Sequence, residues 1–169
     1  MSRVVSEAEL GSGEFFDGKV VLDIGPGPLG FPDACPARLS IGVEPLAEAF
    51  SEHGLMIPDS EALYIASGAE QIPLLSETVD IVLARNSLDH VEDPEAVLAE
   101  AQRILRPAGT LILLFDVEHT PTAAEPHTLS IARVTRALDR TTIIRARKWD
   151  QPFGHDGHRV AIVAEKQRS

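Results

Sequence analysis

The stretch KVVLDIGPGPLG, residues 19–30, decides the fold of this chain. Its first half, residues 19–24, is a run of β-branched and apolar residues, which predicts a buried strand that ends at a loop of glycine and proline. The loop fits the G-x-G-x-x-G pattern, whose glycines allow a tight turn and a close approach of backbone to a bound nucleotide. Glu44 follows a second strand, residues 39–43, where an acid binds ribose hydroxyls. These features predict a nucleotide-binding domain.

Strands and helices alternate along the rest of the chain. Strands are expected at 62–66, 79–84 and 110–115, helices at 46–53, 93–106 and 128–138, and a final antiparallel pair of strands at 141–148 and 158–165. This order predicts an α/β fold, a doubly wound, Rossmann-like, mostly parallel sheet with a C-terminal antiparallel hairpin and helices on both faces. We expect residues 1–18 to form an N-terminal arm and residues 19–169 to form a single domain.

Size and charge narrow the class of protein. The chain has 169 residues, a formal net charge of −11 and one cysteine, Cys35, so an internal disulfide is impossible and a reducing compartment is expected. No apolar run approaches the roughly 20 residues that cross a bilayer, and the N-terminus lacks the apolar core of a signal peptide. We therefore expect a cytoplasmic protein that does not bind a membrane. Because phosphate backbones are bound mainly by Lys and Arg, a chain with this negative charge is also not expected to bind nucleic acid.

The glycine loop favours a nucleotide without a pyrophosphate. Pro26 and Pro28 each remove a backbone N–H donor from the loop. The segment after it, residues 31–38, contains two more prolines and has room for one or two helical turns, so its dipole is small. A dinucleotide needs such a helix N-terminus for its pyrophosphate, whereas S-adenosylmethionine carries adenine and ribose but no phosphate. A nicotinamide-dependent oxidoreductase remains the alternative that the glycine pattern alone suggests.

Several motifs occur in a familiar order between Val20 and Leu114. They are VLDIGPGPLG, IGVEP, GAEQIP and VDIVLARNSLDHVEDPEAVLAEAQRILRPAGTLIL, followed by the terminal hairpin. In this order the chain resembles the class I S-adenosylmethionine-dependent methyltransferases, especially the broad group with LDxGxGxG, AExLP and HVxDP motifs. The resemblance implies S-adenosylmethionine as the cofactor and methyl transfer to an acceptor, which we expect to be a small molecule.

Carried over residue by residue, the resemblance implies a set of cofactor-binding positions. They are Asp23, Gly25, Gly27 and Leu29 around the methionine part, Glu44, Pro45 and Leu46 around ribose and adenine, Gly68, Ala69 and Glu70 at the adenine edge, and Arg85, Asn86 and Ser87 near the sulfonium. Three positions depart from the family pattern. Leu29 stands where the third glycine is expected, Gly68 replaces a frequent aspartate, and Ala108 replaces the first glycine of "PGG", which we expect to be harmless.

Asp89, His90 and His119 are the candidate catalytic residues, because they follow strands whose ends should border the cofactor. Each could serve as a base if the acceptor must lose a proton, and each could instead have a structural role in its loop. No metal site is expected, since His155, Asp156 and His158 lack a third or fourth ligand nearby.

Two further alternatives concern how the site is closed. Phe15 and Phe16 could cover the cofactor or pack under the sheet. Because the loops at 85–92 and 116–127 are short, the site should be open unless the N-terminal arm, a second copy of the chain or a partner subunit closes it. A cofactor-binding, non-catalytic methyltransferase-like module or subunit is therefore the second alternative to an enzyme.

Overall fold

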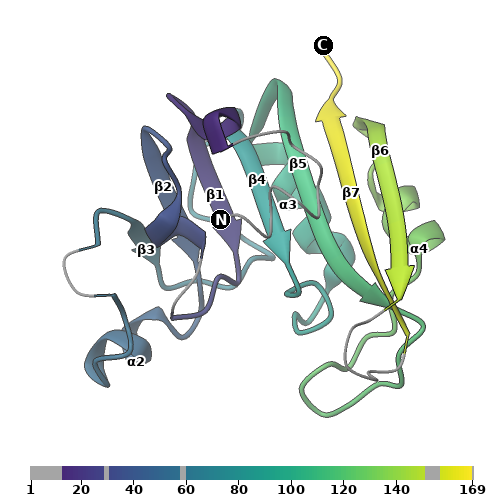
Figure 1. The fold of residues 1–169 in the computed structure, drawn as a ribbon, viewed down its shortest axis with the longest axis horizontal. Coiled ribbons are helices and arrows are strands. Elements are labelled where there is room, and N and C mark those ends of the chain that lie inside the picture. The colour runs from purple at the N-terminus through teal and green to yellow at the C-terminus, as the bar shows by residue number, and fades with distance from the viewer. Residues whose placement is uncertain (1–12, 29–30, 58–59, 151–156, 169) are drawn as a thin grey trace.

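A computed structural model describes residues 13–28, 31–57, 60–150 and 157–168 (Figure 1). These residues form a seven-stranded sheet in the order β3-β2-β1-β4-β5-β7-β6. The strands are β1 (Val20–Ile24), β2 (Leu39–Val43), β3 (Leu63–Ile65), β4 (Val79–Arg85), β5 (Leu105–Val117), β6 (Thr141–Asp150) and β7 (His158–Lys166). The first five strands pair parallel with one another, while β7 pairs antiparallel with both β5 and β6. The mostly parallel sheet with a C-terminal antiparallel hairpin is confirmed.

The strand order reverses between β1 and β4. From β1 the chain proceeds outward through β2 to β3, then crosses back to β4 on the other side of β1. Ile24 pairs with Ala84, so the carboxyl ends of β1 and β4 lie side by side. In a doubly wound sheet a ligand binds beyond the carboxyl ends of the strands at such a reversal. In Figure 1 this is the lower edge of the sheet, where α2 and the loops after β4 and β5 lie.

Among the described residues, three α-helices and two short 3₁₀ helices accompany the strands. They are η1 (Gly13–Phe16), η2 (Phe31–Ala34), α2 (Ala47–Glu52), α3 (Pro94–Ile104) and α4 (Ile131–Ala137). Among the described residues, no helix is both long enough and apolar enough to cross a lipid bilayer. The single turn of η2 is what the prolines of residues 31–38 allow, because proline cannot donate a helical hydrogen bond.

The helix α3 has the start that its sequence predicts and ends earlier than expected. The side chain of Asp93 accepts a hydrogen bond from the Ala96 amide at 3.0 Å, and Pro94 occupies the first turn. The helix stops at Ile104 because Leu105 is extended and pairs with Val79. Residues 105–109 therefore belong to an irregular start of β5, with a register shift before the regular pairing of Ile81 with Thr110.

Ala108 adopts a left-handed backbone conformation, with φ of 60°. For a residue with a side chain, this conformation costs about 1–2 kcal/mol because Cβ approaches the following carbonyl oxygen. The expectation that alanine is a harmless replacement for glycine at this turn is therefore wrong: the backbone there has the conformation that favours glycine.

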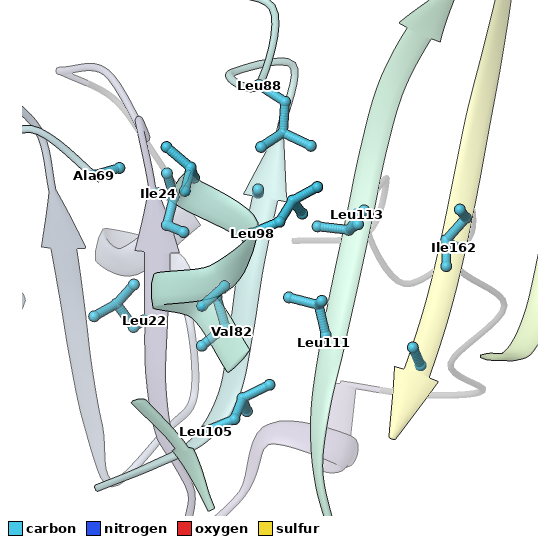
Figure 2. Packing of buried hydrophobic residues seen from close by; sticks show 14 of the residues in the cluster. Leu22, Ile24, Ala69, Val82, Leu88, Leu98, Leu105, Leu111, Leu113 and Ile162 are labelled. Carbon is cyan, nitrogen blue, oxygen red and sulfur yellow. The ribbon is translucent and has the colours of Figure 1, made fainter. Parts of the chain in front are cut away.

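The larger hydrophobic cluster lies between the sheet and the helices α3 and α4 (Figure 2). Leu98 of α3 packs among side chains from the central strands, including Val82 and Leu111, and all three are buried. Val134 and Leu138 extend the same cluster from α4. Burying side chains of this size contributes about 1.5–3 kcal/mol each. This face holds the central strands, and with them the ends of β1 and β4, in place.

The opposite face is covered, among the described residues, by the two 3₁₀ helices rather than by longer α-helices. Phe16 of η1 is fully buried, and its ring centroid lies 5.0 Å from that of Phe31 in η2. Both rings belong to a second cluster that includes Val21 and Leu83. Of the two roles considered for Phe16, packing under the sheet is therefore the observed one. Residues 1–12 of the expected arm lie outside the described residues.

The helix α4 begins three residues later than expected. The sequence favours Thr128 as the N-cap of this helix, but Ser130 caps it, and the Ser130 hydroxyl accepts a hydrogen bond from the Arg133 amide at 3.1 Å. The Thr128 hydroxyl instead donates to the carbonyl oxygen of His119 at 3.2 Å. This contact connects the two ends of the loop between β5 and α4, which passes beside the candidate site.

Candidate functional site

A cavity of about 650 Å³ lies where the carboxyl ends of β1, β2 and β4 meet. The loops after the first four strands supply its wall, as their position at one edge of the sheet predicts. Its lining residues are Ile24, Gly25, Gly27, Val43, Glu44, Pro45, Leu46, Phe50, Gly68, Ala69, Glu70, Asn86, Ser87, His90, Val91 and Glu92. Ten of the thirteen predicted cofactor-binding positions are in this set, so residues separated by more than sixty positions in the sequence are brought to one cavity.

The loop after β1 depends on glycine at two positions. Gly25 and Gly27 both have left-handed backbones, with φ of 63° and 68°. A Cβ atom on Gly25 would lie 2.7 Å from Cβ of Ser87, which is closer than real side chains approach. Glycine at position 25 therefore lets the loop after β1 pack directly against the loop after β4.

Glu44 joins two loops of the cavity. Its side chain is buried, its Oε2 accepts a hydrogen bond from the Gly27 amide at 3.1 Å, and its Oε1 accepts one from the Leu46 amide at 3.1 Å. An ionised carboxylate has about four lone-pair sites. Two of them remain available toward the cavity after both amides are bound, and Pro45 and Leu46 form the more exposed wall beside them.

Glu70 ties the loop after β3 to the start of α3. Its Oε1 accepts hydrogen bonds from the amides of Glu92 at 2.9 Å and Asp93 at 3.4 Å. A Cβ atom on Gly68 would lie 2.9 Å from Oε2 of Glu70, so a larger residue there would have to displace this carboxylate. The methyl group of buried Ala69 lies between these two positions and adds an apolar surface to the cavity.

Asn86 and Ser87 bring two polar side chains to the cavity from the end of β4. Asn86 has a left-handed backbone, with φ of 54°, and its Oδ1 accepts a hydrogen bond from Arg159 of β7 at 3.1 Å. Arg159 also binds Asp116 through two hydrogen bonds of 2.8 and 3.0 Å. The hydroxyl of Ser87 is buried without a hydrogen-bond partner among the described residues. Because buried polar groups are normally paired, this hydroxyl is available to a ligand.

Among the described residues, Asp23 and Arg85 are the predicted positions that do not line the cavity. Asp23 follows Leu22 on β1 and lies on the face of the sheet that η2 covers, because alternate residues of a strand face opposite sides. Arg85 is on the same face of β4. Burial raises the pKa of the Asp23 carboxyl to about 8, although the nearby charge of Arg85 lowers it. Leu29 lies outside the described residues.

The three candidate catalytic residues come together beside the cavity. Asp89 is buried, and its Oδ1 lies 3.8 Å from Nε2 of His90 while its Oδ2 lies 3.6 Å from Nε2 of His119. Glu125, from the loop after β5, places its Oε1 3.9 Å from the same nitrogen of His90. Burial raises the pKa of the Asp89 carboxyl, and the two imidazoles partly offset this effect.

Sequence reasoning missed several residues of the site. Phe50 lies one helical turn after Leu46, so the spacing of α2 already indicated that both face the same side. Val91 and Glu92 extend the cavity wall toward α3. The only sequence feature that indicated this was the length of the loop between β4 and α3. Glu125 lies in a loop whose sequence has no periodic pattern, and Arg159 lies in a predicted strand whose pattern does not indicate contact with residues 86–90.

The order of the strands and its reversal between β1 and β4 define a Rossmann-like domain. The family model described as "Methyltransferase domain" matches residues 22–113, which is more than half of the chain. The chain therefore belongs to the class I methyltransferase family. This assignment favours a methyltransferase over the nicotinamide-dependent oxidoreductase.

Known proteins similar to this chain agree with the family. An uncharacterized methyltransferase of Mycobacterium avium is 32% identical over 111 residues, which are 63% of this chain and 43% of that protein. The chain thus spans less than half of that relative's length. The fold of the present chain matches that of a Burkholderia thailandensis 1,6-didemethyltoxoflavin-N1-methyltransferase solved with bound 1,6-didemethyltoxoflavin and S-adenosylhomocysteine. The TM-score is 0.71 at 17% identity, and the match covers 98% of this chain and 78% of that one.

A cyclase, SpnF, has the same fold, with a TM-score of 0.72, 16% identity and coverage of 99% of this chain and 80% of that one. At such low identities the likeness concerns the fold alone. Because one fold carries several chemistries, the activity has to be argued from the site.

Proposed function

We propose that this chain binds S-adenosylmethionine in the cavity at the ends of β1, β2 and β4 and transfers its methyl group to a small-molecule acceptor. The observation that carries the proposal is the buried carboxylate of Glu44 beside a glycine loop that continues into a single 3₁₀ turn. A carboxylate with two free lone-pair sites suits the two hydroxyls of a ribose. A one-turn helix of four residues offers no dipole for a pyrophosphate. The combination fits an adenosine without a phosphate.

The remaining wall suits the other parts of the same cofactor. Val43, Phe50 and Ala69 offer apolar surface to an adenine ring, and the exposed side chain of Leu46 borders it. Ser87, whose hydroxyl is unpaired among the described residues, and Asn86 are the positions that the family resemblance assigns to the sulfonium end. One methyltransferase of the same fold holds S-adenosylhomocysteine, which supports this choice of cofactor.

Bound there, S-adenosylmethionine would supply an electrophilic methyl group on a sulfonium. The residues of this chain would hold the acceptor in line with that methyl group, and such positioning alone can supply a large part of a rate enhancement. The loops at 86–92 and 119–127 are tied together for this purpose by hydrogen bonds from imidazoles. His90 Nδ1 lies 2.8 Å from the Ala124 carbonyl oxygen, and His127 Nε2 lies 2.9 Å from that of Val91.

Asp89, His90 and His119 remain the proposed residues on the acceptor side. His90 lines the cavity, and Asp89 lies 3.8 Å from His90 and 3.6 Å from His119. A net charge of −11 supports a small acceptor rather than a nucleic acid. The cavity is open, so closure by a second copy of the chain or by a partner subunit is part of the proposal, since exclusion of water strengthens polar contacts.

Isothermal titration with S-adenosylhomocysteine tests the cofactor. Wild type and Glu48→Ala should bind alike, because Glu48 is an exposed residue of the neighbouring helix α2 that does not line the cavity. Glu44→Ala should weaken binding about 10- to 150-fold, the loss expected for charge-assisted hydrogen bonds of about 1.5–3 kcal/mol. Glu44→Gln, which keeps one acceptor oxygen, should fall between them.

Two results would contradict this function. Absence of binding at millimolar S-adenosylhomocysteine, together with thermal stabilisation by NAD, would favour an oxidoreductase. Binding of the cofactor without methyl transfer to any acceptor, even with a copurifying partner chain present, would favour the non-catalytic module. Because Glu44 also binds two amides, circular dichroism must first establish that each variant is folded.

A further inference from the structure

We propose that Asp89, His90 and Glu125 form a binding site for a divalent transition-metal cation, with Zn²⁺ as the best-matched ion. One ligand atom from each of these residues lies within 4.8 Å of the other two. Asp89 and His90 follow β4, and Glu125 comes from the loop after β5, so two loops converge on one point. The sequence predicted no metal site because nothing in its spacing connects residues 89–90 with residue 125.

The distances suit a small cation held by three side chains. Nitrogen and oxygen ligands about 2.0–2.2 Å from Zn²⁺ in tetrahedral geometry are roughly 3.4 Å from each other. His90 Nε2 lies 3.8 Å from Asp89 Oδ1 and 3.9 Å from Glu125 Oε1. A contraction of a few tenths of an ångström brings both carboxylates to that distance from the imidazole nitrogen, and the two carboxylate oxygens lie within 4.8 Å of each other. The side chains of His90 and Glu125 are 40% and 36% exposed, so both can make this movement, while the buried Asp89 stays fixed.

The tautomer of His90 directs a lone pair at the two carboxylates. His90 Nδ1 lies 2.8 Å from the Ala124 carbonyl oxygen, and because a carbonyl only accepts, Nδ1 must carry the proton. In the neutral ring Nε2 then has a lone pair and faces Asp89 and Glu125, which are also acceptors. Histidines that bind metals typically donate their second ring N–H to a carbonyl or carboxylate in this way. A cation between the three acceptors would satisfy all of them.

Asp89 gives an independent indication that a ligand is missing. The residue is 1% exposed, and its Oδ1, the oxygen that faces His90, has no hydrogen-bond partner among the described residues. His119 presents the same situation on the other oxygen. The Nδ1 of His119 lies 3.2 Å from the Thr120 carbonyl oxygen. The buried Nε2 of the same ring lies 3.6 Å from Asp89 Oδ2 and has no hydrogen-bond partner among the described residues. Buried polar groups left unpaired in this way are rare in native proteins.

The ligand set selects the class of ion. An imidazole favours Zn²⁺ and the later transition metals, whereas Mg²⁺ prefers oxygen ligands and retains its water. Three protein ligands leave a fourth position open to water or to an oxygen of the acceptor. His90 also lines the large cavity, so the cation would lie at its edge. Only this link to the acceptor rests on the proposed function; the cation site itself does not.

His158 provides a matched control within the same chain. It also contacts two carboxylates, but Asp150 lies 3.0 Å from Nδ1 and Glu118 lies 3.4 Å from Nε2. The two acids are therefore on opposite nitrogens of the ring and do not share a point with it. Both His158 and His90 are partly exposed, at 36% and 40%, so nonspecific binding of a cation to a surface histidine would be similar at the two positions.

The test is a titration of the metal-free full chain with Zn²⁺, by calorimetry, with Mg²⁺ in a parallel titration. We expect one Zn²⁺ per chain, no comparable binding of Mg²⁺, and unchanged affinity in His158→Ala. Glu125→Gln and Asp89→Asn should each weaken Zn²⁺ binding at least about 10- to 100-fold, since even residues that only support ligands have effects of this size.

The proposal is overturned if wild type shows no saturable Zn²⁺ binding. It is equally overturned if Glu125→Gln binds like wild type while His158→Ala loses the ion. Titration of the same samples with S-adenosylhomocysteine separates the two proposals. In the wild type, absence of Zn²⁺ binding with intact cofactor binding refutes the metal site alone, and Zn²⁺ binding without cofactor binding refutes the proposed function alone. Glu125→Gln also serves as the folded variant, because Glu125 is on a loop and not in the core.

Discussion

The buried carboxyl of Asp23 is expected to make the free energy of unfolding fall as the pH rises. Asp23 is 1% exposed, and neither of its oxygens has a hydrogen-bond partner among the described residues. Burial therefore raises the pKa of this carboxyl to about 8 in the folded state, despite the opposing charge of Arg85. In the unfolded chain the same group titrates near its usual value of 3.8.

The sign of the effect follows from proton binding. Between pH 4 and pH 8 the folded chain holds a proton on Asp23 that the unfolded chain has released, so raising the pH favours unfolding. The contribution of Asp23 to stability is fully present below the unfolded pKa and is lost as the pH rises through the folded one. In this window the slope approaches about 1.4 kcal/mol per pH unit, the free-energy equivalent of one pKa unit. It flattens near pH 8, where the folded carboxyl ionises.

Urea denaturation of wild type and Asp23→Asn at pH 5.5, 6.5 and 7.5 (about one unit apart) measures this slope. Asparagine has nearly the same shape and does not titrate, so the difference between the two proteins isolates Asp23 from every other group. The stability of Asp23→Asn relative to wild type should rise by up to about 1.4 kcal/mol per pH unit. Parallel profiles for the two proteins would show that the carboxyl is already ionised in the folded chain and would refute the reasoning.

Two further predictions concern stability. Ala108→Gly should raise the free energy of unfolding by about 0.5–1 kcal/mol in urea denaturation, because it relieves a left-handed alanine at the expense of a more flexible unfolded chain. Ala99→Gly, at an exposed position within α3, should lower the free energy of unfolding by about 1 kcal/mol. If both variants changed this free energy in the same direction, Ala108 would not be strained. Phe16→Ala should cost about 3–5 kcal/mol, and partly buried Phe15→Ala clearly less, as thermal or urea unfolding would measure; a tolerated Phe16→Ala would place that ring outside the core.

The central part of the fold is predictable because local and global signals agree there. The run of apolar residues before Gly25 and the N-cap Asp93 each specify an element whose position the sheet then confirms. The errors occur where a tertiary contact outweighs the local signal. Leu105 leaves the helical pattern to pair with Val79, and Thr128 binds the His119 carbonyl instead of capping α4. Neither partner is close in sequence, so no local pattern contains the information.

In the candidate site too, residues fixed by a local sequence pattern were predictable and residues brought in by tertiary contacts were not. Glu44 was predictable because its position follows from the strand before it, and strand ends share an edge. Two other contacts of the site were not predictable: Glu125 with His90, and Arg159 with Asn86. They join residues 35 and 73 positions apart in the sequence, through loops and a hairpin. Side-chain contacts across such separations depend on how the sheet twists and how the loops close, which sequence spacing does not encode.

Glu44 and Glu70 suggest why this cavity can be ready for a ligand before one arrives. Each buried or half-buried carboxylate uses part of its capacity on backbone amides, Glu44 on those of Gly27 and Leu46 and Glu70 on that of Glu92. The oxygens are thus oriented by the protein itself, and a ligand that binds them does not have to immobilise two flexible side chains. The same contacts make these residues structural, so replacing Glu44 should loosen two loops as well as remove the proposed binding group. Comparison of Glu44→Gln with Glu44→Ala separates the two effects, because only the former keeps an acceptor for one of the amides.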